Sequence, residues 1–405
     1  MMKGRCHVKI LYQKVATMPL FRLLGIVAAS CCFACFSSVL PAQAPISDVS
    51  NRVDELAAEY IGDGKPIVGG VIGIVDGSKC YAKGYGQISL DEPVPTVPDV
   101  DTIYEIASVS KTFTGTLLGE LAARGELAVT DPLEKFMPSG IAVPQYEGQK
   151  ILLRQLSTHS SGLPRLPTDF WDVAAPTPNN PYKNYTREHF ERFLDSYQLT
   201  VAPDTRYEYS NLAASILGYA MERKTGRTYE QLVQERIGQP LGMEHTAVEL
   251  TDVMRERLAP PYNGEKKPDS NWDLPGFAGG GGLRSSVRDM LRFAQAAAGV
   301  FEVFPELAEK PDHPLIVGMK TASETHYDVP EQQRMGLGWH LTASGDLFHN
   351  GQTGGYHSFI IVDPKSHRAI VILTNTAVGA PDQLGHALWN DFDSLPEDND
   401  MKVED

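Results

Sequence analysis

Cysteine is scarce in the part of the chain that would form a folded domain. Four of the five cysteines fall within the first 44 residues, and only Cys80 lies beyond them. A single thiol cannot form an internal disulfide, so the stability of this domain must come from packing. The remaining residues, roughly 360, are enough for one large domain or for two closely packed ones.

Positive charge is also scarce. The chain has 36 lysines and arginines against 51 aspartates and glutamates, which gives a net charge of −15. It lacks a basic stripe, a glycine-rich phosphate loop and a spaced cluster of histidines and cysteines. These absences exclude nucleic acid and anionic membranes as partners, and they give no reason to expect a metal or a cofactor.

The first 44 residues are typical of an export signal. They contain five basic residues and no acidic one, then an apolar run over 23–40 and the small-residue segment Ala42-Gln43-Ala44. We expect cleavage after Ala44, which would change the net charge to −20. The sequence thus predicts an exported protein, periplasmic or secreted, without stable membrane insertion after cleavage. A membrane anchor, lipid attachment at Cys31 and a start at Met18 instead of Met1 stay open.

Strand patterns occupy both ends of the body, and helical patterns fill its middle. The predicted strands cover 69–75, 79–88, 336–341, 347–350, 356–362 and 369–374. Helices are predicted from Ser47 and over 382–391. This order predicts an α/β (α+β) fold in which N- and C-terminal segments share one antiparallel sheet, flanked by helices and interrupted by a mostly helical insertion.

The predicted domain boundaries follow from the same change of pattern. A leader over 1–44 precedes one domain over 45–393, and an acidic tail follows over 394–405. Within the domain, 45–130 and 276–393 form the α/β part, and 131–275 form the mostly helical part. A functional site would lie in the cleft between these two parts.

A serine and a lysine lie one turn apart at the start of a predicted buried helix. Residues 103–107 are typical of a strand, and 109–124 are typical of a helix. This pattern puts Ser108 and Lys111 on one helix face, so that the lysine can reach the serine hydroxyl. A serine needs a base, and burial lowers the pKa of a lysine toward that role. We predict Ser108 as nucleophile and Lys111 as base, although this spacing alone occurs about once by chance.

Two Tyr-x-Asn segments compete for the next role, in which a tyrosine shares proton transfer beside an amide that binds substrate. Tyr182-Lys183-Asn184 lies in a loop after a proline. Tyr209-Ser210-Asn211 directly precedes an apolar-faced helix, which would hold its side chains rigidly. We therefore predict Tyr209 as catalytic and Asn211 as substrate-binding.

The third element needs a strand edge, where a backbone N–H can point into the cleft. Lys224-Thr225-Gly226 does not qualify, because it closes a predicted helix with Gly226 as its stop. His349-Asn350-Gly351 lies at the end of a predicted strand, and the glycines that follow allow close approach of a substrate. We predict His349 as the third catalytic element. The predicted substrate-binding residues here are Gly351, Gln352 and Thr353.

In this order, Ser108-x-x-Lys111, Tyr209-x-Asn211 and His349-x-Gly351 resemble the motifs of the serine β-lactamase and penicillin-binding-protein superfamily. The resemblance is to the class C β-lactamase branch, and most of all to AmpH-type D-alanyl-D-alanine carboxypeptidase/endopeptidases. Supporting segments span nearly the whole body. They lie at 136–148, 156–164, 240–243, 279–290 and 336–339.

The resemblance implies a mechanism for these residues. Ser108 would form an acyl-enzyme, Lys111 and Tyr209 would share proton transfer, and Asn211 would bind the substrate amide. The backbone N–H groups of Ser108 and Gln352 would hold the oxyanion. His349 stands where the superfamily usually has lysine. The lysine that would help to hold the carboxylate of an acidic peptide end is therefore replaced by a histidine.

The resemblance implies an enzyme, a serine hydrolase that acts on a small-molecule or peptide substrate. We expect a D-alanyl-D-alanine carboxypeptidase/endopeptidase that acts on peptidoglycan peptides. A class C-like β-lactamase, a carboxylesterase and a penicillin-binding sensor module with negligible turnover stay open as alternatives. The sequence predicts no cofactor and no metal, and it leaves the oligomeric state open.

Overall fold

The structure, a computed structural model, describes residues 47–391 with the exception of 330 and 332. The predicted leader over 1–44 and the predicted tail over 394–405 lie outside these residues. Within the described part, no helix is both long enough and apolar enough to cross a membrane.

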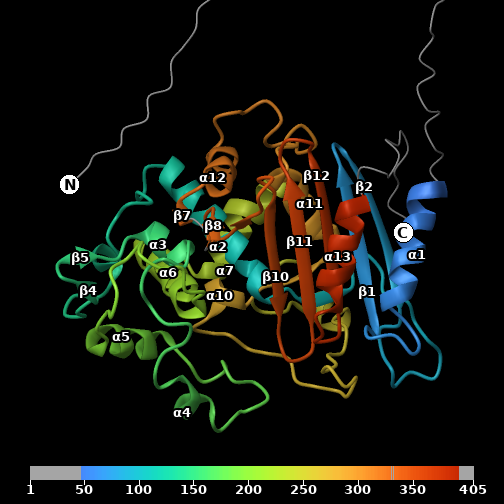
Figure 1. Cartoon of the computed structure of the whole chain (residues 1–405), viewed down its shortest axis with the longest axis horizontal. Helices are drawn as coiled ribbons and strands as arrows, with labels where there is room; N and C mark the ends of the chain where they lie inside the picture. Colours follow the sequence, from blue (N-terminus) through green and yellow to red (C-terminus); the bar gives the residue numbers. More distant parts are fainter. Residues whose placement is uncertain (1–46, 330, 332, 392–405) are drawn as a thin grey trace, which may run out of the picture. The chain divides into compact units, whose positions relative to one another are not determined.

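An eight-stranded antiparallel sheet forms the centre of the molecule (Figure 1). Its order is β2-β1-β12-β11-β10-β9-β8-β7, so the first two strands of the chain join the last six. The strands are β1 Gly69–Asp76, β2 Lys79–Gly86, β7 Tyr327–Val329, β8 Gln333–Met335, β9 His340–Leu341, β10 Leu347–Gln352, β11 His357–Asp363 and β12 Arg368–Thr374. This topology confirms the predicted fold class.

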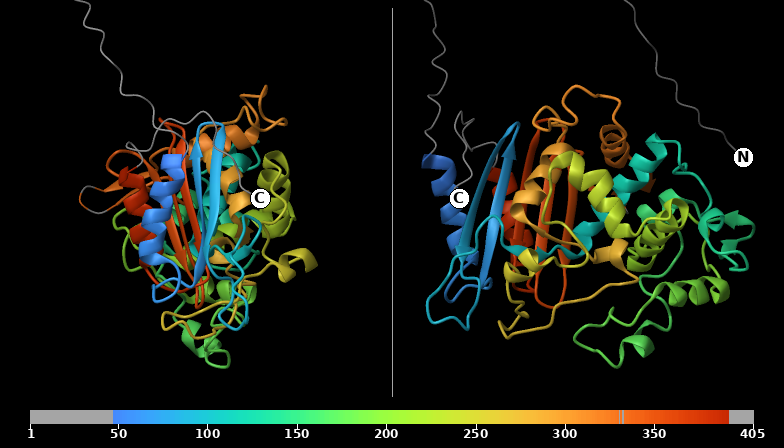
Figure 2. Two further views of the ribbon diagram at one scale, coloured as in Figure 1. Left: turned by 90° about the vertical axis from the view of Figure 1, so that its right-hand side faces the viewer. Right: turned by 180° about the vertical axis from the view of Figure 1, so that it is seen from behind.

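Each face of the sheet packs against its own layer of helices. In β1, Ile72 and Ile74 point to the face covered by α1 Ser47–Tyr60 and α13 Ala380–Asp391. Val71 and Val75 alternate with them and belong to the larger core on the other face, which includes α2 Ser110–Ala123, α11 Val287–Ala297 and α12 Pro314–Ser323. Figures 1 and 2 show α1 and α13 together on one side of the sheet.

Between β2 and the later strands the chain is mostly helical, as the sequence predicts. Its helices are α3 Leu153–Ser157, α4 Phe170–Ala174, α5 Arg187–Ser196, α6 Asn211–Thr225, α7 Tyr229–Val233, α8 Gln239–Leu241, α9 Asp252–Glu256 and α10 Ala278–Gly281. Two short hairpin strands, β4 Gln145–Tyr146 and β5 Gln149–Lys150, lie among them. Helices α3, α5 and α6 lie on the side of the sheet that carries β7 and β8 (Figure 1).

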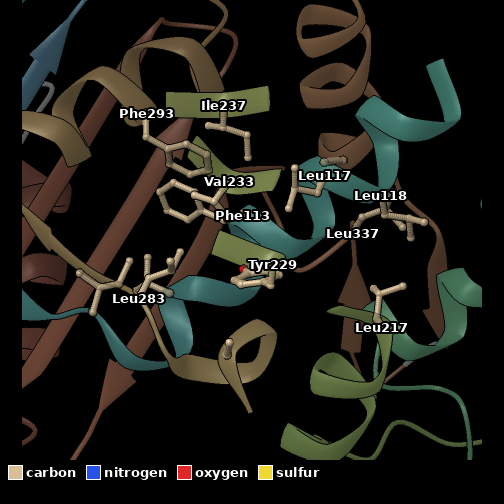
Figure 3. Close-up of a cluster of buried hydrophobic side chains, with 14 of the residues drawn as sticks. Phe113, Leu117, Leu118, Leu217, Tyr229, Val233, Ile237, Leu283, Phe293 and Leu337 are labelled. Carbon is tan, nitrogen blue, oxygen red and sulfur yellow. The ribbon is translucent and has the colours of Figure 1, made fainter. Parts of the chain in front are cut away.

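Helix α2 passes through the larger core, so the residues at its N-terminus have a rigid support (Figure 3). Phe113 stacks on Phe293 of α11 with ring centroids 3.9 Å apart. The hydroxyls of Thr114 and Tyr229 are 2.8 Å apart, which satisfies two polar groups in an apolar environment. Close packing of this kind leaves little freedom for the helix to shift.

The strand predictions fail in detail where the strands are short. Strand β9 covers only two residues of the predicted strand 336–341, and β7 and β8 were not predicted. β3 Ile103–Glu105 is shorter than the predicted 103–107, and it pairs with β6 Arg284–Ser286 instead of joining the large sheet. Such short strands depend on their neighbours for hydrogen bonds and carry little periodicity of their own.

Candidate active site

Ser108 lies in a tight turn between β3 and α2. Residues 107–109 form a 3₁₀ turn, so Ser108 precedes the α-helix instead of lying in its first turn. Ala107 has a φ of 46°, a left-handed conformation that costs free energy for a residue with a Cβ. Hydrogen bonds hold the turn on both sides: Ile106 N donates to Leu283 O, and Leu283 N donates to Ser110 Oγ, each at 3.0 Å.

Lys111 lies beneath Ser108 and is 1% exposed. Its Nζ is 3.0 Å from Ser108 Oγ and 2.9 Å from Asn211 Oδ1, and it also donates to Gly280 O. Burial lowers the pKa of Lys111 well below its usual value, and the nearby Arg165 adds to this shift. A neutral amine can donate one proton to Asn211 Oδ1 and the other to Gly280 O. Its lone pair is then left to accept the proton of the Ser108 hydroxyl. The contacts therefore suit a base.

Tyr209 also contacts Ser108, through a hydrogen bond between the two hydroxyls, and the centroid of its ring is 4.9 Å from Lys111 Nζ. Burial raises the pKa of Tyr209 to about 12, although this hydrogen bond and Arg165 oppose the shift. His159 supports the ring, with centroids 4.5 Å apart, and its Nδ1 accepts from Ser210 N at 3.1 Å. A phenol with such a pKa stays protonated near neutral pH, so it can donate a proton but does not act as a free phenolate.

Asn211 is the first residue of α6, and both ends of its amide are used. Its Oδ1 accepts from Lys111, and its Nδ2 donates to the hydroxyl of Tyr182 at 3.2 Å. Ser210 caps the helix, because its Oγ accepts from Ala213 N at 2.9 Å. The segment at 182–184, which the sequence argument sets aside, thus supplies a second tyrosine beside the predicted site.

Strand β10 brings Gly351 against the nucleophile. A Cβ on Gly351 would lie 2.7 Å from Ser108 N and 2.6 Å from Ile106 O, so only glycine fits without a shift. Thr353 N donates to Tyr356 O at 3.1 Å. Since the amides of an antiparallel strand alternate between its two edges, Gln352 N points away from β11 and toward the turn that carries Ser108.

His349 lies behind the site and is 1% exposed. Its Nδ1 donates to Asn350 O at 2.6 Å, and its ring centroid is 6.3 Å from that of Tyr209. Burial lowers the pKa of His349 well below its usual value, with help from His340 and Lys111. The imidazole is therefore neutral near pH 7, and its Nε2 has no hydrogen-bond partner among the described residues.

The Lys-Thr-Gly at 224–226 lies at the end of α6. Gly226 has a φ of 69° and forms the helix C-cap, and Lys224 is exposed. The structure therefore confirms the interpretation of this triplet as a helix stop.

Ser108 lies between two cavities. The larger, of about 660 Å³, opens beside Tyr209 and β10. Its lining includes Ser108, Arg165, Tyr209, Gln333, His340, Leu341, Thr342, Phe348, Asn350, Gly351, Gln352, His357, Gly379 and Asp382. The smaller, of about 30 Å³, lies beside Asn211. Its lining includes Ala107, Ser108, Tyr182, Asn211, Trp272, Leu274, Phe277, Gly280, Gly281, Gln352 and Thr353.

Most residues that line the larger cavity were not predicted from the sequence, Arg165, Asp382 and His340 among them. Arg165 has its guanidinium carbon 5.1 Å from the centroid of the Tyr209 ring, and it forms no ion pair with a carboxylate of the described residues. Asp382 comes from the first turn of α13, and His340 comes from β9. Arg165 directly follows the segment 156–164, which supports the family resemblance, and this position is its one local signal.

The fold and the Ser108–Lys111–Tyr209 arrangement define a serine hydrolase. The chain belongs to the β-lactamase family, whose model, described as Beta-lactamase, matches residues 53–391.

Particular relatives agree with this assignment. The chain is 30% identical over 363 residues to the D-alanyl-D-alanine-carboxypeptidase/endopeptidase AmpH of Escherichia coli (strain K12), covering 86% of this chain and 90% of the relative. It is 25% identical over 408 residues to a beta-lactamase of the same strain, covering 91% and 97%. A crystal structure of a beta-lactamase/D-alanine carboxypeptidase from Yersinia pestis has a TM-score of 0.68 at 22% identity, covering 84% and 99%. That likeness concerns the fold.

Proposed function

We propose that this chain is an exported D-alanyl-D-alanine carboxypeptidase/endopeptidase that acts on cell-wall peptides through an acyl-enzyme. The observation that carries this proposal is the contact of Ser108 with Lys111 and Tyr209 in a cavity that Arg165 also lines, a residue whose guanidinium has no ion-pair partner among the described residues. A cation at this place suits a substrate that ends in a carboxylate. The 30% identity to a protein named for the same activity supports it.

In the proposed acylation, Ser108 Oγ attacks the carbonyl carbon of the scissile amide while its proton passes to Lys111 Nζ. The negative charge that forms on the carbonyl oxygen is held by the N–H groups of Ser108 and Gln352. Each such donor typically contributes about 3 kcal/mol to the stability of the transition state. Asn211 binds the substrate amide on the acyl side.

Collapse of this intermediate breaks the carbon–nitrogen bond. The Tyr209 hydroxyl gives its proton to the leaving nitrogen and regains one from the Lys111 ammonium, so the site returns to its starting charge. Water then repeats the attack on the ester of Ser108 with the same groups. His349 takes no proton in this scheme, and we propose that it supports Asn350 and the end of β10 through its buried hydrogen bond.

Labelling with a fluorescent penicillin tests the nucleophile. We expect a covalent adduct with the unmodified protein and none with Ser108→Ala. Turnover of a D-alanyl-D-alanine peptide, nitrocefin and a p-nitrophenyl ester then separates peptidase, β-lactamase and esterase activity. If only the ester is cleaved, the peptidase proposal fails, and if no probe forms an adduct that depends on Ser108, the assignment of the nucleophile fails.

Export is tested independently of activity. We propose that the chain is processed after Ala44 and released to the periplasm or the medium. N-terminal sequencing of the protein recovered from these fractions should begin at Pro45. A protein that keeps the first 44 residues, or that carries lipid at Cys31, would contradict this proposal.

A further inference from the structure

The larger cavity holds two side chains of opposite formal charge, and they come from different parts of the fold. Arg165 belongs to the loop after α3, next to Tyr209. Asp382 belongs to the first turn of α13, which covers the sheet. Both line the cavity that contains Ser108. A substrate group placed there meets an anion as well as a cation.

The leaving group occupies this cavity if the proposed function holds, because a general acid must lie beside the atom that it protonates. Tyr209 is that acid, and it lines the larger cavity. Asn211, which binds the acyl side, lines the smaller one. The smaller cavity, of about 30 Å³, leaves far less space beside Ser108 than the larger one, of about 660 Å³.

Asp382 is fixed in place but keeps capacity for a ligand. Its Oδ2 accepts from Asn350 Nδ2 at 2.8 Å, and its Oδ1 is 2.8 Å from His357 Nε2. His357 in turn contacts Gln352 Oε1 through Nδ1 at 3.1 Å. Two carboxylate oxygens offer about four acceptor sites, so these contacts leave part of the capacity unused. The side chain is 26% exposed.

We propose that Asp382 forms a subsite for a cationic group on the leaving residue. Peptides whose leaving residue carries an ammonium are then better substrates than peptides that leave D-alanine or an acidic residue. The α-carboxylate of that residue pairs with Arg165, and its side-chain ammonium pairs with Asp382. Opposite charges attract more strongly in a partly buried cavity than in water, and a second carboxylate near Asp382 is repelled.

A series of peptides with one acyl part tests the subsite. They end in D-alanyl-D-lysine, D-alanyl-D-norleucine or D-alanyl-D-glutamate, so lysine and norleucine differ mainly in charge. We expect kcat/KM to be roughly tenfold higher for lysine than for norleucine, and lowest for glutamate. Asp382→Asn should bring the lysine-to-norleucine ratio near one. Asp312→Asn, which removes an exposed charge outside the cavity lining, should leave the ratio unchanged.

A positioning role for Asp382 gives a different result. If Asp382 only holds Asn350 and α13, then Asp382→Asn lowers kcat/KM for all three peptides by the same factor, and the proposal is wrong. A measurement on the unmodified protein avoids any effect on folding. Raising the salt concentration from about 0.05 to 0.5 M should reduce the lysine-to-norleucine ratio, because salt screens a partly exposed ion pair. A lysine-to-norleucine ratio that does not change with salt concentration would contradict the proposal.

Esters separate the failure of the subsite from the failure of the peptidase proposal. Phenyl acetates whose leaving phenol carries an aminomethyl or a methyl group need only the serine chemistry. If no peptide is cleaved but the aminomethyl ester is favoured in a manner that depends on Asp382, the subsite stands and the peptidase proposal falls. If peptides are cleaved without preference for charge, the subsite falls and the peptidase proposal stands.

Discussion

The wall of the cleft formed by α2 and α6 differs from the wall formed by β10 and α13 in how its polar groups are partnered. On the helical wall, Lys111 and Asn211 are held by hydrogen bonds to each other, to Ser108, to Gly280 and to Tyr182, and Asn211 keeps its second amide proton for the substrate. On the strand wall, Asn350 and Asp382 bind each other but still line the open cavity. The helical wall fixes the groups that react with every substrate, and the strand wall offers polar groups to the variable part of a substrate.

This difference assigns separate tasks to the two walls. A base and a nucleophile need fixed positions and low water content, because proton transfer depends on both distance and pKa. Substrate choice needs groups that still have hydrogen bonds to give or accept. We therefore expect changes on the helical wall to affect all substrates, and changes on the strand wall to affect substrates unequally.

The largest effect should come from Lys111. Lys111→Arg keeps a basic side chain, but a guanidinium stays protonated and cannot accept the Ser108 proton, so acylation of Ser108 should slow by about a thousandfold. The rate of labelling by a fluorescent penicillin measures this, with circular dichroism as the check on folding. A folded variant that keeps more than a tenth of the rate would show that Lys111 is not the base.

The pH profile of the unmodified protein examines the same wall. Because burial lowers the pKa of Lys111, its amine is neutral and active above that lowered value, and the rate falls as the pH falls through it. Tyr209, with a pKa raised to about 12, should stay protonated up to the most alkaline conditions that the protein tolerates. An acylation rate that drops between pH 7 and 9 would contradict these directions.

The next effect concerns the point where the walls meet. Gly351→Ala places a Cβ 2.7 Å from Ser108 N, so the strand must move and the oxyanion site opens. We expect a loss of about a hundredfold in kcat for peptide and ester alike, as for the removal of one oxyanion donor. Gly264→Ala is the matched control, since the nearest atom to its Cβ is 3.4 Å away. If Gly351→Ala is as active as Gly264→Ala, then Gly351 does not contribute to the oxyanion site.

A smaller effect should appear in stability on the strand wall. Burial, with a contribution from Lys111, lowers the pKa of His340 to about 4. Between pH 6.5 and 4 the unfolded chain binds a proton at His340 that the folded chain does not, so stability falls as the pH falls through this window. From pH 7 to 4.5 this contribution is about 2 kcal/mol. Urea unfolding measures this. Between pH 7 and 4.5, the free energy of unfolding of His340→Asn should fall by about 2 kcal/mol less than that of the unmodified protein.

The smallest effect separates the two triplets. His349→Ala removes a buried ring that supports β10, and we expect acylation to slow by about tenfold. Lys224→Ala changes an exposed residue at the end of α6, and the rate should stay within about twofold. The reverse outcome would make the helical triplet the functional one.

The sequence predicts the helical wall better than the strand wall, and the reason is physical. Ser108 and Lys111 lie three residues apart, and Tyr209 and Asn211 lie two apart at the start of α6, so local periodicity places each pair. Asp382 reaches the cavity only because α13 packs across β11 and β12, and no local pattern encodes that contact. His340 is similar, since β9 is too short to be recognised without its neighbours.

The turn at Ser108 shows the same limit on a smaller scale. The sequence predicts a strand directly followed by a helix, whereas the chain inserts a 3₁₀ turn with Ala107 in a left-handed conformation. The contacts that hold this turn come from Leu283 and from Ser358, whose Oγ donates to Ile106 O at 2.7 Å. Both residues are distant in sequence, so no local preference could reveal the turn.

The position of β1 in the sheet has a consequence for the order in which the protein can fold. β1 pairs with β12 along its whole length, from Gly70 opposite Thr374 to Asp76 opposite Arg368. The ribosome must therefore have made the chain through Thr374 before the centre of the sheet can close, and pairing over such a separation is slow. β10, which carries Gln352, pairs with β11 in a hairpin that is made before β12, but this hairpin joins β1 only through β12. A nascent chain therefore cannot acylate before β10 and the strands that follow it have been made.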